Sequence, residues 1–163
     1  MFEIRRLLPP DAEQYRRIRL STLATNPDYF GSTYEEESTL PLSDFAARLA
    51  NAATFGACTD QGVVGTMLLR RETRPREAHK GHVNGVFVEP AWRGRGIAAA
   101  LLTALIADAR QDLEQLILTV MAGNDAAIAL YQRFGFVTYG VEPRARKLAF
   151  GYADNVLMAL LLT

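Results

Sequence analysis

Two glycines that open a helix are the first feature of this sequence with a clear chemical use. The segment Val86–Ala99 reads as a strand, a loop after Pro90, and a helix that starts near Gly96. The first amides of a helix have no acceptor inside the helix, and they lie at the positive end of its dipole. Glycines at positions 94 and 96 remove the side chains that would keep a ligand away. These amides can therefore hold a phosphate group.

Arg93 and Arg95 add positive charge at the same turn, although an ordinary tight turn with solvated arginines is the alternative. Gly94-x-Gly96-x-x-Ala99 also satisfies the dinucleotide-binding fingerprint formally. Loop residues separate it from its strand, however, and the next strand, 116–121, carries no acidic residue at its end. No Gly-Lys-Ser/Thr follows for a P-loop. A nucleotide-binding oxidoreductase is therefore the weakest of the three functional hypotheses for this protein. The two stronger ones follow from the motifs described next.

A second predicted helix carries two polar residues on nearly one face. Asn124 and Tyr131 are seven residues apart, which is about 10 Å, or two turns, along a helix. One side chain could hold an extended ligand while the other meets its reactive end. The alternatives are a helix cap for Asn124 and a core aromatic for Tyr131.

Together the two segments resemble the GNAT superfamily of acyl-CoA-dependent N-acyltransferases. The superfamily signature Arg/Gln-x-x-Gly-x-Gly/Ala after a strand stands here as Arg93–Ala98. A second block, Asn-x-x-Ala-x-x-Leu-Tyr followed by Gly-Phe, stands as Asn124–Tyr131 with Phe134–Phe136. Two blocks in the right order and spacing are far more specific than either block alone.

The resemblance implies acetyl-CoA as cosubstrate, with its pyrophosphate on the amides of about Arg95 to Ala98. The pantetheine arm would run beside Val86–Val88 like an added strand, Asn124 would bond the arm, and the Tyr131 hydroxyl would point at the thioester sulfur. The cofactor-binding residues expected in this way are Val86, Phe87, Val88, Arg93, Gly94, Arg95, Gly96, Ile97, Ala98, Asn124, Ala127 and Tyr131.

Acyl transfer to an amine needs a neutral amine. Deprotonating a lysine-like amine at pH 7 costs about 4.6 kcal/mol, so the reaction needs a base, a desolvated amine or a weakly basic substrate. A thiol with a pKa near 8.5 leaves easily, so proton donation by Tyr131 should give a modest gain. A backbone amide near Val88 could stabilise the oxyanion.

The general base is left open by the sequence. Many relatives place a glutamate on the strand before the signature, whereas this chain has His82–Gly85 there without a carboxylate. Glu89, at the end of the strand, is the catalytic candidate that we retain beside Tyr131. Other candidates are His82 through a water, one of Glu35 to Glu37, and Asp154, although solvation is the ordinary fate of such glutamates. For His79 and His82 we expect a solvated loop and no metal site, since no further His or Cys joins them.

Residues 1–163 should form one domain, in which antiparallel strands come first and strand–helix–strand units follow. This order predicts an α+β (mixed α/β) fold. The resemblance makes it a GNAT-like, mostly antiparallel twisted sheet of about six to seven strands with about four helices. We expect strands at 2–5, 54–59, 63–70, 83–88, 116–120, 136–139 and 156–162, helices at 9–24, 44–50, 96–110 and 124–134, and polar or loop segments at 31–39, 70–80 and 140–155.

Composition bears on partners and location. Eighteen basic residues balance eighteen acidic ones, so neither nucleic acid nor an anionic membrane is an expected partner. Cys58 is the single cysteine, which excludes an intrachain disulfide. A charged N-terminus without a signal-peptide pattern, and apolar runs too short to span a membrane, predict a cytoplasmic protein. The apolar final strand and the habit of the family suggest a homodimer.

The leading hypothesis is an N-acetyltransferase that moves an acetyl group from acetyl-CoA to a primary amine of a small molecule or of a protein or peptide. The amine would attack directly in a ternary complex. The second hypothesis is a non-catalytic CoA-binding sensor or interaction module that has lost its base. We expect the acceptor pocket to come from residues 26–41 and 140–155, whose mixed charges name no substrate.

Overall fold

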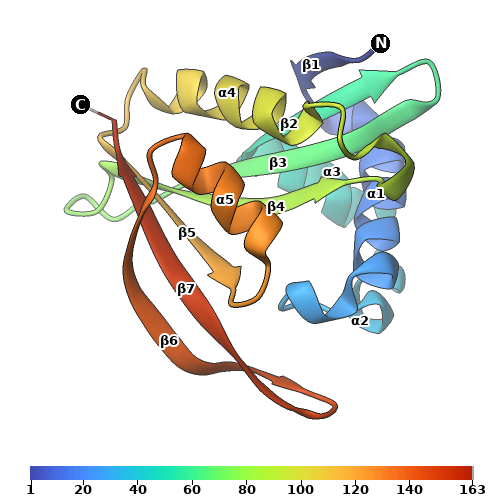
Figure 1. Cartoon of the computed structure of the whole chain (residues 1–163). Helices are drawn as coiled ribbons and strands as arrows, with labels where there is room; N and C mark the ends of the chain where they lie inside the picture. The colour runs from blue at the N-terminus through green and yellow to red at the C-terminus, as the bar shows by residue number, and fades with distance from the viewer. Residues whose placement is uncertain (163) are drawn as a thin grey trace.

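A seven-stranded sheet forms the centre of the structure, a computed structural model that describes residues 1–162 (Figure 1). Its strand order is β1-β2-β3-β4-β5-β7-β6, and β4 with β5 is the parallel pair among antiparallel neighbours. The expected α+β fold is thereby confirmed: residues 1–162 contain seven strands, and they contain five α-helices where about four were expected. The strands are β1 (Glu3–Arg6), β2 (Ala53–Thr59), β3 (Gly62–Arg71), β4 (Lys80–Val88), β5 (Gln115–Met121), β6 (Val137–Leu148) and β7 (Gly151–Leu161).

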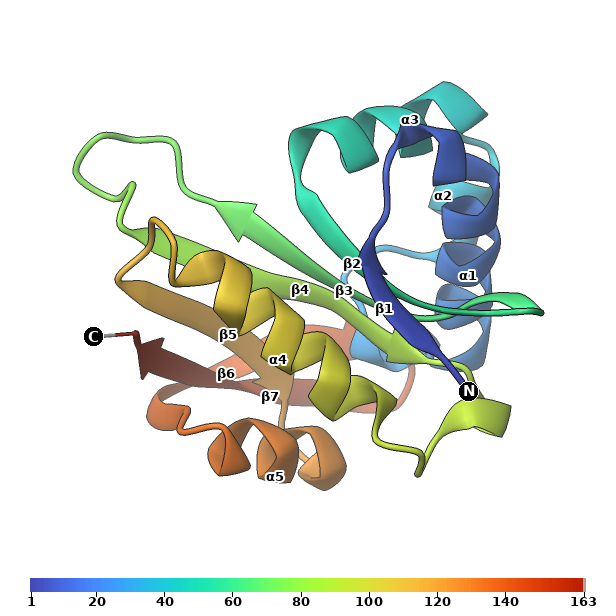
Figure 2. The same ribbon diagram turned by 90° about the horizontal axis from the view of Figure 1, so that it is seen from above.

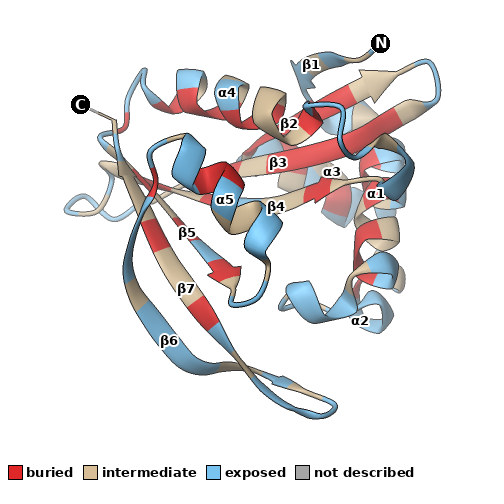
Figure 3. Cartoon of the chain, viewed as in Figure 1, coloured by how far each residue is buried: buried red, intermediate tan, exposed pale blue. Residues whose placement is uncertain are grey.

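The helices cover both faces of the sheet, with α1 to α3 on one side and α4 and α5 on the other (Figure 2). Each side has its own buried core, one around Leu101 and Leu105 and the other around Ile18 and Phe45 (Figure 3). None of the helices in residues 1–162 is long and apolar enough to cross a membrane. The helices are α1 (Ala12–Thr25), α2 (Tyr34–Ser38), α3 (Leu42–Asn51), α4 (Ile97–Ala109) and α5 (Asp125–Arg133).

Helix α4 is held against the sheet by its apolar residues. The segment is rich in Ala and Leu, which are good helix formers. Ile97, Leu101 and Leu105 are at most 2% exposed, and burying each stabilises the fold by about 1.5–3 kcal/mol. At Gly65 on β3, an added Cβ would lie 2.9 Å from the Ile97 side chain. The glycine therefore lets the first turn of α4 approach the sheet closely.

The strands β4 and β5 separate after a short parallel ladder. They pair from Lys80 with Gln115 to His82 with Ile117, and both then continue without pairing to each other. A register shift between β3 and β4 accompanies this separation, and Gly85 in β4 adopts a positive φ of 58°. The resulting bulge bends β4 away from β5. One edge of β4 is therefore left without a strand partner along the second half of its length.

The C-terminal hairpin differs from the expectation. Residues 140–155 were predicted to be a loop, but β6 and β7 continue through most of this segment as paired strands with two register shifts. Most of β6 is exposed, so it lacks the alternation of apolar residues that signals a strand. Pro143 reads as a turn residue, yet it is tolerated here because β6 is an edge strand.

The sequence marked segment 31–39 only as a polar stretch, and the structure adds a short helix there. It contains α2, which starts with a capping box between Thr33 and Glu36. The Glu36 amide donates to Thr33 Oγ1 at 3.2 Å, and the Thr33 amide donates to the Glu36 carboxylate at 2.8 Å. The Thr-x-x-Glu pattern was the overlooked sequence signal.

Candidate active site

The glycine turn before α4 is open to a ligand. Gly94 and Gly96 have φ angles of 74° and 79°, in the left-handed region that favours glycine. A Cβ added at either position would meet no atom within 4 Å. Within residues 1–162, the amides of residues 94–99 donate no hydrogen bond to a protein acceptor. The turn therefore has the geometry of an anion site at a helix N-terminus.

The two arginines of the turn lie over aromatic rings. The Arg95 guanidinium is 4.7 Å from the Trp92 ring centre, and that of Arg93 is 5.8 Å from the Phe87 ring centre. Arg93 Nε also donates to the carbonyl of Val88 at 3.0 Å. Both residues are exposed, and these contacts hold their charges near the open amides.

A cavity of about 540 Å³ lies between the separated strands and reaches α5 and the α1–α2 connection. This volume is within the roughly 300–1,000 Å³ of small-molecule sites. Gly94, Arg95, Gly96 and Ile97 build the adjoining turn but do not line it. The expected cofactor residues that do line the cavity are Val86, Phe87, Val88, Arg93, Ala98, Asn124, Ala127 and Tyr131.

Tyr131 and Asn124 both reach this cavity from α5. Tyr131 is only 5% exposed, and its ring packs edge-to-face against Phe136. Burial raises the pKa of Tyr131 to about 12, so its hydroxyl keeps its proton at neutral pH. Asn124 is the N-cap residue of α5, but its side chain makes no capping hydrogen bond. The side-chain amide of Asn124 is therefore available to a ligand.

The backbone of β4 offers a hydrogen-bond donor, the Val88 N–H, to the opening between β4 and β5. The Glu89 amide donates to the carbonyl of Val64 on β3 at 2.8 Å. Consecutive N–H groups of an extended strand point to opposite edges. The Val88 N–H therefore points away from β3, toward the opening between β4 and β5.

Glu89 lies outside the set of residues that line the cavity. Its carboxylate accepts a hydrogen bond from Ser21 Oγ at 3.2 Å and lies 3.9 Å from Arg17 Nη1. Asp154, another candidate base, accepts a hydrogen bond from the Arg144 amide in the hairpin. Among the described residues, no Asp or Glu lines the cavity.

The two histidines also lie elsewhere. His82 was expected in a solvated loop, and this was wrong, because it belongs to β4 and its Nε2 lies 2.7 Å from Glu72 Oε1. That hydrogen bond lowers the pKa of Glu72. His82 does not line the cavity. Within residues 1–162, no group of three or more His, Cys, Asp or Glu side chains is placed to hold a metal ion.

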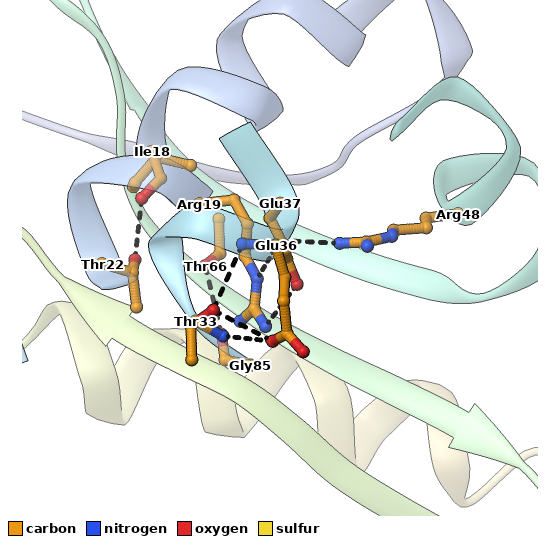
Figure 4. Close-up of polar contacts among 9 residues, drawn as sticks. All are labelled: Ile18, Arg19, Thr22, Thr33, Glu36, Glu37, Arg48, Thr66 and Gly85. Atoms are coloured by element: carbon orange, nitrogen blue, oxygen red, sulfur yellow. Dashed lines mark hydrogen bonds and ion pairs between the residues drawn. The ribbon is translucent and has the colours of Figure 1, made fainter. Parts of the chain in front are cut away.

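Glu37 is buried, contrary to the solvated state expected for residues 35–37 (Figure 4). Its carboxylate accepts two hydrogen bonds from Arg19, at 3.0 and 3.1 Å, and one from Arg48 at 3.1 Å. Burial alone would raise the pKa of Glu37, but the two arginines outweigh it and hold the pKa below its usual value. Arg19 in turn lies 5.6 Å from the ring centre of Phe30, which lines the cavity. The cluster thus fixes one cavity wall to α1, α2 and α3.

Comparison with known proteins identifies the family. A sequence profile described as "Acetyltransferase (GNAT) family" matches residues 11–136. The chain therefore belongs to the GNAT family of acetyltransferases, as the two sequence motifs predicted.

Curated relatives show the same relationship. An L-amino acid N-acetyltransferase of Escherichia coli is 32% identical over 63% of this chain. An L-methionine sulfoximine/L-methionine sulfone acetyltransferase of Pseudomonas aeruginosa is 36% identical over 74% of it. The chain spans only 64% and 63% of the lengths of these two proteins. An N-alpha-acetyltransferase of Saccharolobus solfataricus is 32% identical, with 83% of this chain and 80% of that protein covered.

Solved structures share the whole fold. A GNAT-family acetyltransferase of Streptococcus pneumoniae superposes with a TM-score of 0.86 at 25% identity, and each chain is covered completely. A ribosomal-protein-alanine N-acetyltransferase of Brucella melitensis has a TM-score of 0.84, with 98% of this chain and 99% of that chain covered. At 23% identity, the second match bears on the fold alone.

Proposed function

We propose that this protein transfers the acetyl group of acetyl-CoA to a primary amine of a small molecule or of a protein or peptide, within a ternary complex. The observation that carries the proposal is the row of amides at residues 94–99 without acceptors, beside a cavity that Tyr131 also lines. Ala98, in the first turn of α4, lines this cavity, so the anion site and the cavity adjoin. Residues 1–163 would act as one catalytic domain.

The cofactor would lie in the opening between β4 and β5. Its pyrophosphate would accept hydrogen bonds from the amides of about residues 95–98, with Arg93 and Arg95 adding charge. The pantetheine arm would bond the free edge of Val86–Val88 and the Asn124 amide. The lack of a strand partner along this edge supports the placement, because an extended arm can complete the ladder there.

The reaction would proceed by direct attack of the amine nitrogen on the thioester carbonyl carbon. The new oxyanion would accept a hydrogen bond from the Val88 N–H, which points into the opening. Collapse of the tetrahedral intermediate would break the C–S bond, and the Tyr131 hydroxyl would give its proton to the departing sulfur. The amine would lose its proton to solvent.

The charges of the cavity offer a way to obtain the neutral amine. Arg19, Arg93 and Arg146 line it without a single carboxylate from the described residues. Nearby positive charge disfavours an ammonium ion and lowers the pKa of a bound amine. For Glu89, the one acidic residue that we retained from the sequence, a base role would require a bridging water, because it lies outside the lining.

The relatives support an α-amino group as the acceptor. Two of them are described as acting on L-amino acids or amino-acid derivatives, and a third as an N-alpha-acetyltransferase. We extend this to the present chain as a proposal only. A cytoplasmic location and a homodimer, with neither nucleic acid nor membrane as partner, are further parts of the same proposal.

Calorimetric titration with acetyl-CoA, followed by detection of released CoA thiol across a panel of amines, tests the proposal. We expect saturable binding and turnover with at least one amine. Absence of binding at millimolar acetyl-CoA would refute it. Binding without turnover of any amine would favour the sensor hypothesis, which the lack of a carboxylate in the cavity lining supports.

A further inference from the structure

An arginine without a partner lies in the wall of the cavity. Arg146 on β6 lines the cavity, and its Nη1 is buried with no hydrogen-bond partner among residues 1–162. Thr54 Oγ1 and Asn155 Oδ1 share this state, but neither residue lines the cavity. A buried polar group without a partner is costly, and more so when it is charged. A ligand group that accepts from this nitrogen would remove that cost.

The protein supplies no carboxylate for this guanidinium. Asp28 lines an adjoining hollow together with Arg146, yet it does not provide Nη1 with an acceptor. Burial lowers the pKa of Arg146, since no neighbouring charge offsets the loss of water. An arginine nevertheless stays protonated in proteins. The wall therefore presents a positive charge that no carboxylate among residues 1–162 neutralises.

The other two arginines of the cavity are already engaged. Arg19 binds the Glu37 carboxylate with two hydrogen bonds. Arg93 donates to the Val88 carbonyl and borders the turn proposed to hold the cofactor phosphates. Arg146 is thus the cavity arginine whose binding capacity the protein leaves unused.

Arg146 lies where the cavity meets an adjoining hollow that none of the proposed cofactor residues line. It borders both the cavity and the adjoining hollow, and in both it is accompanied by Phe30 and Gly31 of the α1–α2 connection. The β6–β7 hairpin, whose curved course Figure 1 shows, meets this connection at the hollow, because Asp28 and Phe30 line it together with Ala145 and Leu148. An acceptor that enters between them would meet Arg146 on its way toward Tyr131.

We propose that the acceptor is a small amine that carries a carboxylate, and that the Arg146 guanidinium binds this carboxylate at the acceptor end of the cavity. The planar guanidinium matches a carboxylate with two parallel hydrogen bonds. A volume of about 540 Å³, shared with the end of the cofactor arm, suits a compact acceptor. This assignment rests on the proposed acetyl transfer, and it makes Arg146 a specificity-determining residue.

Kinetics with matched pairs of acceptors test the assignment. L-Alanine, L-leucine, L-methionine and L-phenylalanine would each be compared with the corresponding carboxamide, which keeps the amine and replaces the carboxylate with a neutral group. We expect the best amino acid to exceed its amide in kcat/KM by about 10- to 100-fold. This preference is the more telling because the amide, with its less basic amine, has more neutral nucleophile at a given pH.

The variant Arg146→Gln should raise the KM of the amino acid and abolish its advantage over the amide. The Kd of acetyl-CoA should stay unchanged. Arg144→Gln is the matched control, because Arg144 lies on the same strand, stacks on Tyr152 and does not line the cavity. It should keep the preference of the wild type. If Arg146→Gln does not fold, Arg146→Lys and the wild-type ratio of acid to amide still decide the question.

Several results would overturn the assignment while acetyl transfer stands. The first is a kcat/KM for the amides that equals or exceeds that for the amino acids. The second is an unchanged ratio of amino-acid to amide kcat/KM in folded Arg146→Gln. The third is turnover restricted to uncharged amines, peptides or phosphoethanolamine. Failure to bind acetyl-CoA would instead refute the proposed function itself, so the two failures are distinguishable.

Discussion

At the scale of single residues, Tyr131 is the group whose chemistry depends most on its surroundings. A tyrosine in water has a pKa near 10, whereas burial in the cavity wall raises that of Tyr131 to about 12. The shift disfavours tyrosinate, so the proposed role of Tyr131 is that of a proton donor and not of a base. Such a donor would assist a departing thiolate by giving it a proton. The assistance would be modest, because a thiolate also leaves without it.

Replacement Tyr131→Phe should lower kcat by about 100-fold, the low end of the effect of a general acid. The Kd of acetyl-CoA should change little, because the ring and its contact with Phe136 are kept. Stopped-flow or steady-state measurement of thiol release checks this. Tyr139→Phe, on the exposed part of β6, is the control and should match the wild type. An unchanged kcat in Tyr131→Phe would exclude the proton-donor role.

The same residue sets an expectation for pH. Because its folded-state pKa is about 12, the acid form persists through the range in which most proteins stay folded. We expect no loss of kcat from deprotonation of a tyrosine between pH 7 and about 10. A decline near pH 10 that is absent from Tyr131→Phe would mean that burial does not protect the hydroxyl.

At the scale of elements, the turn before α4 combines an open backbone with a positive helix end. Both glycines adopt left-handed conformations, and both face space rather than protein. The apolar face of α4 and the close approach at Gly65 fix this helix end beside β4. The element thus positions the amides without any side chain having to touch the ligand.

Gly96→Glu should abolish binding of acetyl-CoA while the protein still folds. The substitution adds a carboxylate where the pyrophosphate would lie and costs about 1–2 kcal/mol of backbone strain. Calorimetry reports binding, and circular dichroism reports the fold. Gly151→Glu adds the same side chain at another positive-φ glycine with open space, in the distant hairpin, and should bind normally. Affinity near the wild-type value in folded Gly96→Glu would place the phosphates elsewhere.

Helices α1, α2 and α3 are joined through the carboxylate of Glu37. Glu37→Gln should reduce the free energy of unfolding by about 3 kcal/mol, the low end for breaking a buried ion pair, since Arg48 is partly exposed. The folded-state pKa of Glu37 is lowered, so its stabilisation is complete above the unfolded pKa and is lost as pH falls through the folded value. The difference between wild type and variant in urea unfolding should therefore be full at pH 7 and shrink below about pH 4.5.

Glu35→Gln, an exposed change on the same short helix, provides the control for Glu37→Gln. It should alter stability by less than about 0.5 kcal/mol. Equal stability of Glu37→Gln and wild type at pH 7 would show that the cluster does not support the wall that carries Phe30.

At the scale of the whole molecule, β4 and β5 are paired at one end only. The two halves of the sheet, β1–β4 and β5–β7, therefore diverge and leave one opening between them. The ladder between them is confined to residues 80–82 and 115–117, and the cavity occupies the place where pairing would otherwise continue. A ligand between the strands would therefore bridge β1–β4 with the β5–β7 side. Binding there should stabilise the entire fold rather than a single loop.

Acetyl-CoA at 100 times its Kd should stabilise the protein by about 2.7 kcal/mol. For a chain of 163 residues, this corresponds to a rise in Tm of about 5–10 °C. Differential scanning fluorimetry measures the shift, and hydrogen exchange should show added protection at residues 94–99 and along Val86–Val88. A shift of this size with protection confined to other segments would contradict the placement of the cofactor between the strands.

Much of the fold and the family could be read from local sequence patterns. The glycine turn, the Asn124–Tyr131 spacing and the apolar run of α4 are short-range features, so each constrained its own element directly. The two missed segments, α2 and most of β6, are largely polar, and most of their residues other than Glu37 are exposed. Their structure comes from a capping box and from pairing with β7, which apolar periodicity does not reveal.

The cavity and its charges depend on tertiary structure. Arg146 is 53 residues from Arg93 in sequence, and no local pattern indicates that both would line one cavity with Arg19. Glu37 looked solvated because the sequence does not show that Arg19 and Arg48 converge on it. Local patterns are set by neighbours along the chain, whereas burial and ion pairing follow from which distant segments meet. For that reason the motifs alone predicted a phosphate site, whereas the folded chain was needed to show an arginine in the cavity wall whose Nη1 has no partner among residues 1–162.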